Sequence, residues 1–311
     1  METKGKIYLQ LTLMILLWCL SFIMVDIGVD IIPPFSLALY RFIISSLVFF
    51  CIRLYTRMKS NSSKIEKERI VDPSISKLDW LYIIIASFSG ITLFFFTQYS
   101  AIQIIGPSLP ALFVCLLAPV IIAILALVVF NERINKLKLV GFTVATIGGF
   151  LLVTGGDIQT LNPNTPNFLG YFYALLTPLL WAVYSIISKK ITKKISTIKF
   201  LEIISYFGTV ELFLFVLFTG QFAILIINSL NPILILSGLY LGFGCHIIGY
   251  YIWTQSQHKI DSFKAASFLY IEPFITLIFS FLLQREETIV ILNILGGIIV
   301  LIGVIVINYE R

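Results

Sequence analysis

The sequence is short of charge and of the residues that build soluble catalytic sites. Only 12% of its 311 residues are Asp, Glu, Lys or Arg, and 59% are hydrophobic, whereas soluble domains are about one quarter charged and about half apolar. It has two histidines, four cysteines with no Cys-x-x-Cys spacing, and no P-loop motif. These shortages exclude nucleic-acid binding, soluble metalloenzymes and disulfide-rich extracellular domains, and they argue against ATP-driven transport. We expect neither a metal nor another cofactor.

Long apolar runs take the place of the missing charge. The hydrocarbon core of a bilayer is about 30 Å thick and is crossed by about 20 helical residues, and backbone groups in lipid must be satisfied within their own segment. We therefore predict an all-α integral membrane protein. Its ten expected transmembrane helices lie at residues 7–26, 36–56, 80–101, 108–130, 138–155, 168–188, 200–220, 233–256, 263–283 and 288–308.

The basic residues are divided very unevenly between the two sides of this arrangement. Counted loop by loop, 20 of the 22 Lys and Arg residues fall on the side of both termini, Arg285 stands alone on the other side, and Arg41 lies within a span. Cytoplasmic loops carry the excess of Lys and Arg. We therefore expect a multi-pass protein of the cell membrane with both termini cytoplasmic, and we interpret the net charge of +6 as an orientation signal.

Short motifs recur in the two halves of the chain at a nearly constant distance, which falls only from 163 to 154 residues. The matched pairs are Leu16-Leu17-Trp18 with Leu179-Leu180-Trp181, Thr97-Gln98 with Thr254-Gln255, Pro119 with Pro273, Glu132 with Glu286, Gly141 with Gly296, and Gly148 with Gly303. The pattern predicts two five-helix repeats, residues 1–156 and 157–311.

Five helices are an odd number, so the second repeat must enter the membrane from the opposite side. Inverted repeats of this kind are typical of secondary transporters, whose substrate site lies near the membrane midplane between the repeats. The alternative is a duplication that was retained for packing alone.

A further series of motifs runs along the chain: Leu17-Trp18 with Ser21-Phe22, Tyr40-Arg41-Phe42, residues 101–108, Ala118-Pro119 through Asn131-Glu132-Arg133, and residues 268–273 through Glu286. In their order and spacing, these motifs resemble the EamA family of the drug/metabolite transporter superfamily over essentially the whole chain. The resemblance implies a central cavity lined by spans one to four and six to nine, peripheral fifth and tenth spans, and movement of small organic solutes.

Few ionisable groups lie within the expected spans, and a charge at that depth costs at least about 2.5 kcal/mol, so each is a functional candidate. Glu211 lies in the middle of its span, and Glu272 precedes Pro273, whose missing N–H favours a kink. We expect Glu211 and Glu272 to serve in proton or charge coupling. The alternative for each is a hydrogen bond to a neighbouring helix.

Arg41 is the one arginine inside an expected span. The forked N–H groups of its guanidinium can bind a carboxylate through two hydrogen bonds. We expect it either to pair with Glu272, Glu211 or a substrate carboxylate, or to extend toward the outer headgroups. Aromatic stripes at helical spacing mark spans six and eight, and they are interpreted as cavity wall or as helix packing. The expected cavity residues are Trp18, Arg41, Gln98, Trp181, Tyr184, His246, Tyr250, Trp253 and Tyr270.

Glycines recur every seven residues in the fifth and tenth spans, at Gly141, Gly148, Gly296 and Gly303. Small residues let helices approach closely in lipid. The pattern predicts close helix packing here, and a homodimer surface through these two spans is a second interpretation.

The scarcity of buried cations narrows the function. Carriers of phosphorylated or nucleotide sugars must compensate two or more negative charges, whereas this chain offers only Arg41 and a protonated His246. We therefore predict a secondary permease of small organic metabolites such as amino acids or aromatic and amine compounds. We expect export as the direction of transport and a proton gradient as the candidate driving force. Its partners would be membrane lipid and the small-molecule substrate. The alternatives are a sugar-phosphate carrier, a membrane enzyme acting on lipid or isoprenoid, and a structural or sensor role.

Overall fold

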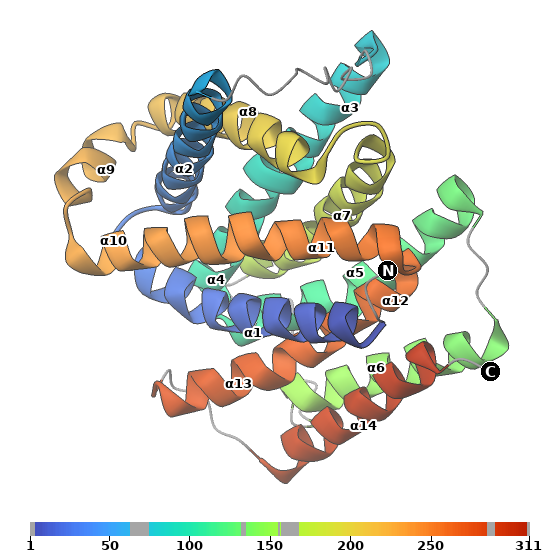
Figure 1. Cartoon of the computed structure of the whole chain (residues 1–311). Coiled ribbons are helices and arrows are strands. Elements are labelled where there is room, and N and C mark those ends of the chain that lie inside the picture. The colour runs from blue at the N-terminus through green and yellow to red at the C-terminus, as the bar shows by residue number, and fades with distance from the viewer. Residues whose placement is uncertain are drawn as a thin grey trace.

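The structure is a computed structural model, and it describes residues 4–62, 75–131, 135–154, 156, 168–284 and 290–309. Regular secondary structure in these ranges is entirely helical (Figure 1). The first half contains α1 (Lys4–Val29), α2 (Pro34–Ser62), α3 (Lys77–Ser87), η1 (Phe88–Leu93), α4 (Phe94–Ile105), α5 (Ser108–Phe130) and α6 (Lys136–Thr154). The second half contains α7 (Phe168–Ile191), α8 (Thr197–Phe218), α9 (Phe222–Asn228), α10 (Pro232–Leu239), η3 (Tyr240–Gly249), α11 (Tyr250–Lys259), α12 (Ser262–Ser267), η4 (Phe268–Ile271), α13 (Glu272–Leu282) and α14 (Ile291–Asn308).

Eight helical stretches within the described residues are long and apolar enough to cross a membrane. They are α1, α2, α3–η1–α4, α5, α7, α8, α10–η3–α11 and α12–η4–α13, and each coincides with an expected span. The fifth and tenth expected spans are also helices, α6 and α14, although the apolar part of α14 is shorter, at Ile294–Asn308. The chain is therefore an all-helical, multi-pass membrane protein. The expected boundary between the repeats, after residue 156, lies at the edge of a described range. The matched Glu132 and Glu286 lie outside the described residues.

Three of the crossing stretches are not continuous α-helix. The segments η1 and η3 are π-helical, and η4 is a 3-10 turn that precedes Pro273. Only the last interruption was predictable, because a proline removes a helix donor. Both π segments carry a glycine against an aromatic ring: a Cβ on Gly90 would lie 2.3 Å from Tyr184, and one on Gly249 would lie 2.4 Å from Trp18. Each ring belongs to the first helix of the other repeat.

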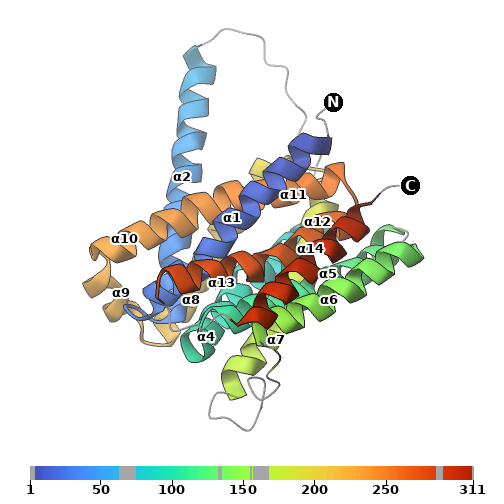
Figure 2. The same ribbon diagram turned by 90° about the horizontal axis from the view of Figure 1, so that it is seen from below.

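The helices α6 and α14 lie side by side at one edge of the bundle (Figures 1 and 2). A Cβ on Gly141 would lie 3.0 Å from the carbonyl oxygen of Gly303, and one on Gly148 would lie 2.9 Å from that of Gly296. The two helices are therefore antiparallel. The two contacts are equivalent, because Gly141 and Gly148 of α6 correspond to Gly296 and Gly303 of α14. The expected glycine faces pack on each other within the chain, so the predicted homodimer would have to use other faces of these helices.

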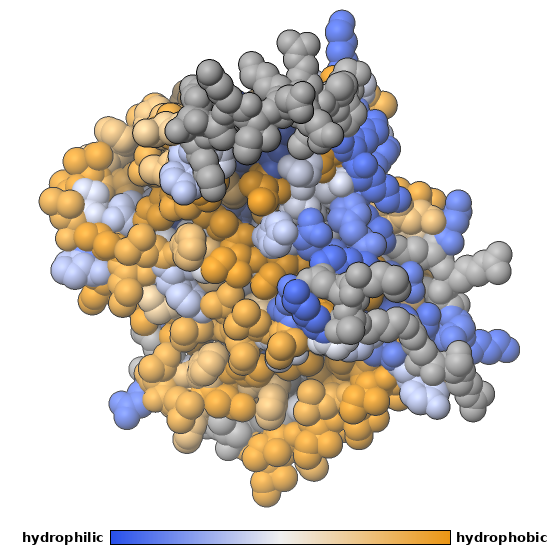
Figure 3. Space-filling view, in the orientation of Figure 1, coloured by the Kyte–Doolittle hydropathy of each residue, from blue (hydrophilic) through white to orange (hydrophobic). Residues whose placement is uncertain are grey.

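Apolar side chains cover much of the outside of the molecule. Val128, Phe218, Ile227 and Ile291 are each at least 75% exposed. The view in Figure 3 shows a broad apolar surface, and most hydrophilic residues gather toward the side on which both termini lie in Figure 1. Such a surface is suited to lipid contact, because hydrocarbon imposes no penalty on exposed apolar groups.

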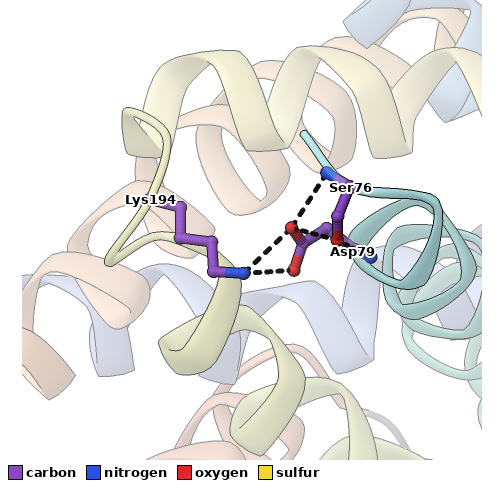
Figure 4. Close-up of polar contacts among 3 residues, drawn as sticks. All are labelled: Ser76, Asp79 and Lys194. Atoms are coloured by element: carbon purple, nitrogen blue, oxygen red, sulfur yellow. Dashed lines mark hydrogen bonds and ion pairs between the residues drawn. The ribbon is translucent and has the colours of Figure 1, made fainter. Parts of the chain in front are cut away.

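A capping box fixes the start of α3. The Ser76 hydroxyl accepts a hydrogen bond from the Asp79 N–H at 3.2 Å, and the Ser76 N–H donates to the Asp79 carboxylate at 3.1 Å. Lys194, in the turn between α7 and α8, reaches the same carboxylate at 2.7 and 2.9 Å (Figure 4). These contacts tie the third helix of the first repeat to the second repeat at one end of the bundle.

Candidate functional site

A cavity of about 40 Å³ lies between the two halves of the molecule. Its wall is mostly aromatic and aliphatic, with a guanidinium, an amide and a carboxyl as the polar groups. From the first half it is lined by Trp18, Ser21, Phe22, Arg41, Phe94, Phe95, Gln98 and Val114, and from the second half by Trp181, Cys245, Tyr250, Leu269 and Glu272. Five of the nine expected cavity residues are therefore in the wall, namely Trp18, Arg41, Gln98, Trp181 and Tyr250, together with Glu272, one of the two expected coupling carboxyls.

Two tryptophans at equivalent positions in the repeats lie in contact in the cavity wall. The rings of Trp18 and Trp181 meet edge to face with their centroids 5.3 Å apart. Tyr250 lies 6.0 Å from the first ring and 5.2 Å from the second. The Trp18 indole N–H donates to the Cys245 carbonyl at 3.1 Å, and the Tyr250 hydroxyl donates to the Gly90 carbonyl at 3.2 Å. Trp18 and Tyr250 are thus each anchored to a π segment of the other repeat.

Arg41 is a buried cation in this wall, with only 2% of its surface exposed. Its Nη1 donates to the Tyr99 hydroxyl at 2.6 Å and its Nη2 donates to the Leu241 carbonyl at 2.8 Å, while the guanidinium lies 4.1 Å over the Phe95 ring. The expectation that Arg41 extends to the outer headgroups is wrong, because these partners hold it inside. Its Nε has no hydrogen-bond partner, and its partners among the described residues include no carboxylate.

Glu272 begins α13, where the 3-10 turn η4 gives way to α-helix, and it is 3% exposed. Its Oε2 accepts a hydrogen bond from the Cys115 thiol at 3.2 Å, and its backbone carbonyl accepts one from Cys19 at 3.4 Å. Glu272 is thus a carboxyl in an otherwise thiol and aromatic environment.

Four expected cavity residues lie behind the wall instead of in it. Tyr184 packs on the Trp181 ring at 5.2 Å, and the Trp253 indole donates to the Ser185 hydroxyl at 3.2 Å. His246 hydrogen-bonds the Ser205 hydroxyl at 2.8 Å and lies against Phe42 and Tyr250. Tyr270 points toward α6, where its hydroxyl lies 3.2 Å from that of Thr146. These side chains support the wall from a second layer.

Glu211, the other expected coupling carboxyl, also lies outside the cavity. It is half-buried between α8 and the third helix of the first repeat. Its Oε2 accepts hydrogen bonds from Thr92 at 2.5 Å and from Ser87 at 3.2 Å.

Several wall residues were not singled out by the sequence. Phe94 lies four residues before the expected Gln98 on one face of α4, so it could have been inferred from Gln98, but in a chain with 27 phenylalanines this spacing is common. Cys245 and Leu269 had no distinguishing pattern, because their place in the wall depends on η3 and η4. Ser21 and Phe22 stood only in a motif of the family resemblance.

An apolar helical bundle with a polar-tipped cavity between two repeated halves has the architecture of a secondary transporter. The chain belongs to the EamA-like transporter family, whose model matches residues 5–154 and 168–309. It is 28% identical over 301 residues to an uncharacterized transporter of Archaeoglobus fulgidus, covering 97% of this chain and 96% of that one. It is 23% identical over 298 residues to a probable amino-acid metabolite efflux pump of Escherichia coli, covering 94% and 91%. A solved crystal structure at 18% identity shares the fold, with a TM-score of 0.68 and coverage of 98% and 97%.

Proposed function

We propose that the chain is a secondary exporter of small organic metabolites, located in the cell membrane with both termini in the cytoplasm. One observation carries the proposal: a cavity between the repeats holds a single guanidinium from the first repeat and a single carboxyl from the second, set in aromatic rings. The relative in Escherichia coli is named an efflux pump, which supports the outward direction.

The proposal includes ten crossings, with α6 and α14 as the fifth and tenth. Helices of 19 and 18 residues are about 27–28 Å long, close to the hydrocarbon thickness of about 30 Å. Their antiparallel contact through reciprocal glycines supports an inverted pair of repeats.

The wall chemistry favours a zwitterionic or amine-bearing solute with an apolar body. Arg41 keeps its charge when buried, and its free Nε–H is a donor suited to a carboxylate. Glu272 supplies the complementary charge for an amine, and Trp18, Trp181 and Tyr250 supply faces for an apolar or aromatic side chain. A phosphorylated or nucleotide sugar would bring at least two negative charges against one arginine in this wall, and the second-layer His246 does not line it.

We further propose that Glu272 exchanges a proton for the substrate's amine. A carboxyl in the cavity wall must be neutralised when the amine leaves, because an unpaired charge is costly at this depth. Protonation of Glu272 from the outer side would neutralise this carboxylate and link efflux to the proton gradient. Rocking of one repeat against the other would expose the wall to each side in turn.

The test uses purified full-length protein in proteoliposomes loaded with radiolabelled amino acids and amines. We expect saturable, substrate-specific counterflow in the wild type and faster net transport under a pH gradient. Glu272→Gln should abolish the effect of the gradient while counterflow of at least one substrate persists. Glu202→Gln is the matched control, because Glu202 lies on α8 and is paired with Arg53 at 3.2 Å.

Two results would contradict these proposals separately. If folded wild-type protein moves no solute across several chemical classes, the transport proposal fails. If Glu272→Gln shows an unchanged response to the pH gradient, transport stands but the coupling role of Glu272 does not.

A further inference from the structure

A cluster of oxygen atoms surrounds Glu211, on the side of α8 that faces the third helix of the first repeat. Thr92 Oγ1 lies 2.5 Å and Ser87 Oγ 3.2 Å from Glu211 Oε2, and Ser87 Oγ lies 3.3 Å from the carbonyl oxygen of Ile204. Both hydroxyl-bearing residues are fully buried. The four oxygens come from α8 and from the stretch that joins α3 to η1, and they share no residue with the wall of the central cavity.

The π segment η1 is what brings the two hydroxyls together. Ser87 and Thr92 are five residues apart, which on an α-helix of 3.6 residues per turn places them about 140° apart, on different faces. A π-helix closes its turns between residues i and i+5, so it sets these two residues one above the other. The wide turn starts at Phe88, directly after Ser87, and contains Thr92. The local departure from α-helix therefore builds the oxygen cluster.

Within the described residues, Glu211 has no positive partner to balance it. Its hydrogen-bond partners in the described part of the chain are the two hydroxyls, and neither ion pair found there includes it. A carboxylate at this depth of the membrane needs a cation or a proton, since an isolated charge is strongly disfavoured there.

The donor atoms indicate which cation. Carboxylate, hydroxyl and carbonyl oxygens suit hard cations, and Ca²⁺, which is close to Na⁺ in radius, binds oxygen ligands at about 2.3–2.6 Å. Two ligands at right angles around such an ion are about 3.4 Å apart, close to the two longer separations in the cluster. The environment of Glu272 differs, because its side-chain partner is the Cys115 thiol, a poor ligand for a hard cation.

We propose that Glu211, Ser87, Thr92 and the Ile204 carbonyl form a binding site for a single Na⁺ ion, separate from the substrate cavity. Na⁺ has the radius and the preference for oxygen that this set fits, and one positive charge neutralises the one carboxylate. The partly exposed side of Glu211 leaves room for water to complete the coordination shell. The site rests on the geometry alone and does not depend on the proton exchange proposed for Glu272.

The test measures Na⁺ binding directly and without substrate. Purified full-length protein is titrated with ²²Na⁺ in a scintillation assay, and its melting temperature is followed as NaCl replaces KCl at constant ionic strength. We expect saturable binding and a rise in melting temperature with Na⁺ over K⁺. Glu211→Gln and Thr92→Val should raise the half-saturating Na⁺ concentration at least tenfold, whereas Thr92→Ser, which keeps the hydroxyl, should retain binding.

Ser89→Ala and Glu202→Gln serve as matched controls and should bind like the wild type. Ser89 is buried in η1 but hydrogen-bonds only the Ile85 carbonyl, and Glu202 is paired with Arg53. The proposal is overturned if the folded wild type binds no ²²Na⁺, if Glu211→Gln or Thr92→Val binds it unchanged, or if pH alone and not Na⁺ shifts the melting temperature. Because no solute is transported in this assay, its failure leaves the proposed export function untouched.

Discussion

Arg41 is held in the cavity wall by neutral groups. The Tyr99 hydroxyl and the Leu241 carbonyl fix two corners of its fork, and the Phe95 ring covers one face of it. A guanidinium that is oriented but not neutralised keeps its attraction for an incoming anion, because its partners carry no full charge. The residue is thus arranged to meet a carboxylate that comes with the substrate.

Replacing Arg41 by Lys should therefore weaken transport of substrates that carry a carboxylate. A hydrogen bond to a charged group contributes about 1.5–3 kcal/mol, so we expect at least a tenfold rise in KM for an amino acid. Tyr99→Phe, which removes one anchor of the fork, should give a smaller rise. The measurement is concentration-dependent counterflow of an amino acid and of the corresponding amine without the carboxyl.

Arg53→Lys is the matched control, because Arg53 lies on the same helix in an exposed ion pair with Glu202. An equal loss for the amine and the amino acid would show that Arg41 stabilises the wall without recognising a carboxylate.

The π segments explain why some cavity residues were predictable and others were not. Trp18 and Trp181 were found through the constant distance between the repeats, which needs no knowledge of helix geometry. On span eight, the expected aromatic stripe consists of His246, Tyr250 and Trp253, which share one face of an α-helix that turns by 100° per residue. His246 lies in a π-helix, where this angle does not apply. Only Tyr250 of the three reaches the cavity.

The same geometry gives η3 its contact with α1. Tyr240 and Cys245 are five residues apart, and both donate to the Leu17 carbonyl, at 2.7 and 3.4 Å. No residue type marks a π segment in the sequence, so the partners of Arg41 and Glu211 were also out of reach. The helices themselves were predictable, because long apolar runs determine them whatever their local winding.

Two glycines of η3 provide a matched pair for testing how tightly this segment packs. A Cβ on Gly249 would lie 2.4 Å from the Trp18 indole nitrogen, whereas one on Gly244 would meet nothing closer than 3.9 Å. Gly249→Ala should destabilise the protein by about 1–3 kcal/mol through overpacking and should slow transport. Gly244→Ala should be neutral or slightly stabilising, since alanine is the better helix former. Thermal unfolding and counterflow of both variants check this, and equal behaviour of the two would contradict it.

The whole molecule is predicted to place both termini on the cytoplasmic side. The prediction rests on the distribution of Lys and Arg and on an even number of crossings. Fusions of a cytoplasm-active fluorescent protein and of a periplasm-active phosphatase, placed after Asn308 and between α9 and α10 (after Ser229), test it. We expect fluorescence at the first site and phosphatase activity at the second. Phosphatase activity at the first site would mean that α14 does not cross.

The reciprocal glycine contact between α6 and α14 also has a consequence for how the protein is made. Gly141 and Gly148 meet Gly303 and Gly296, about 150 to 160 positions further along the chain. A ribosome that adds about 5–20 residues per second needs roughly 7–30 s to reach them. If α6 crosses the membrane as proposed, its glycine face is open to lipid or to other helices during that interval. The helix that covers this face is α14, so this edge of the bundle is completed only after α14 has been synthesised.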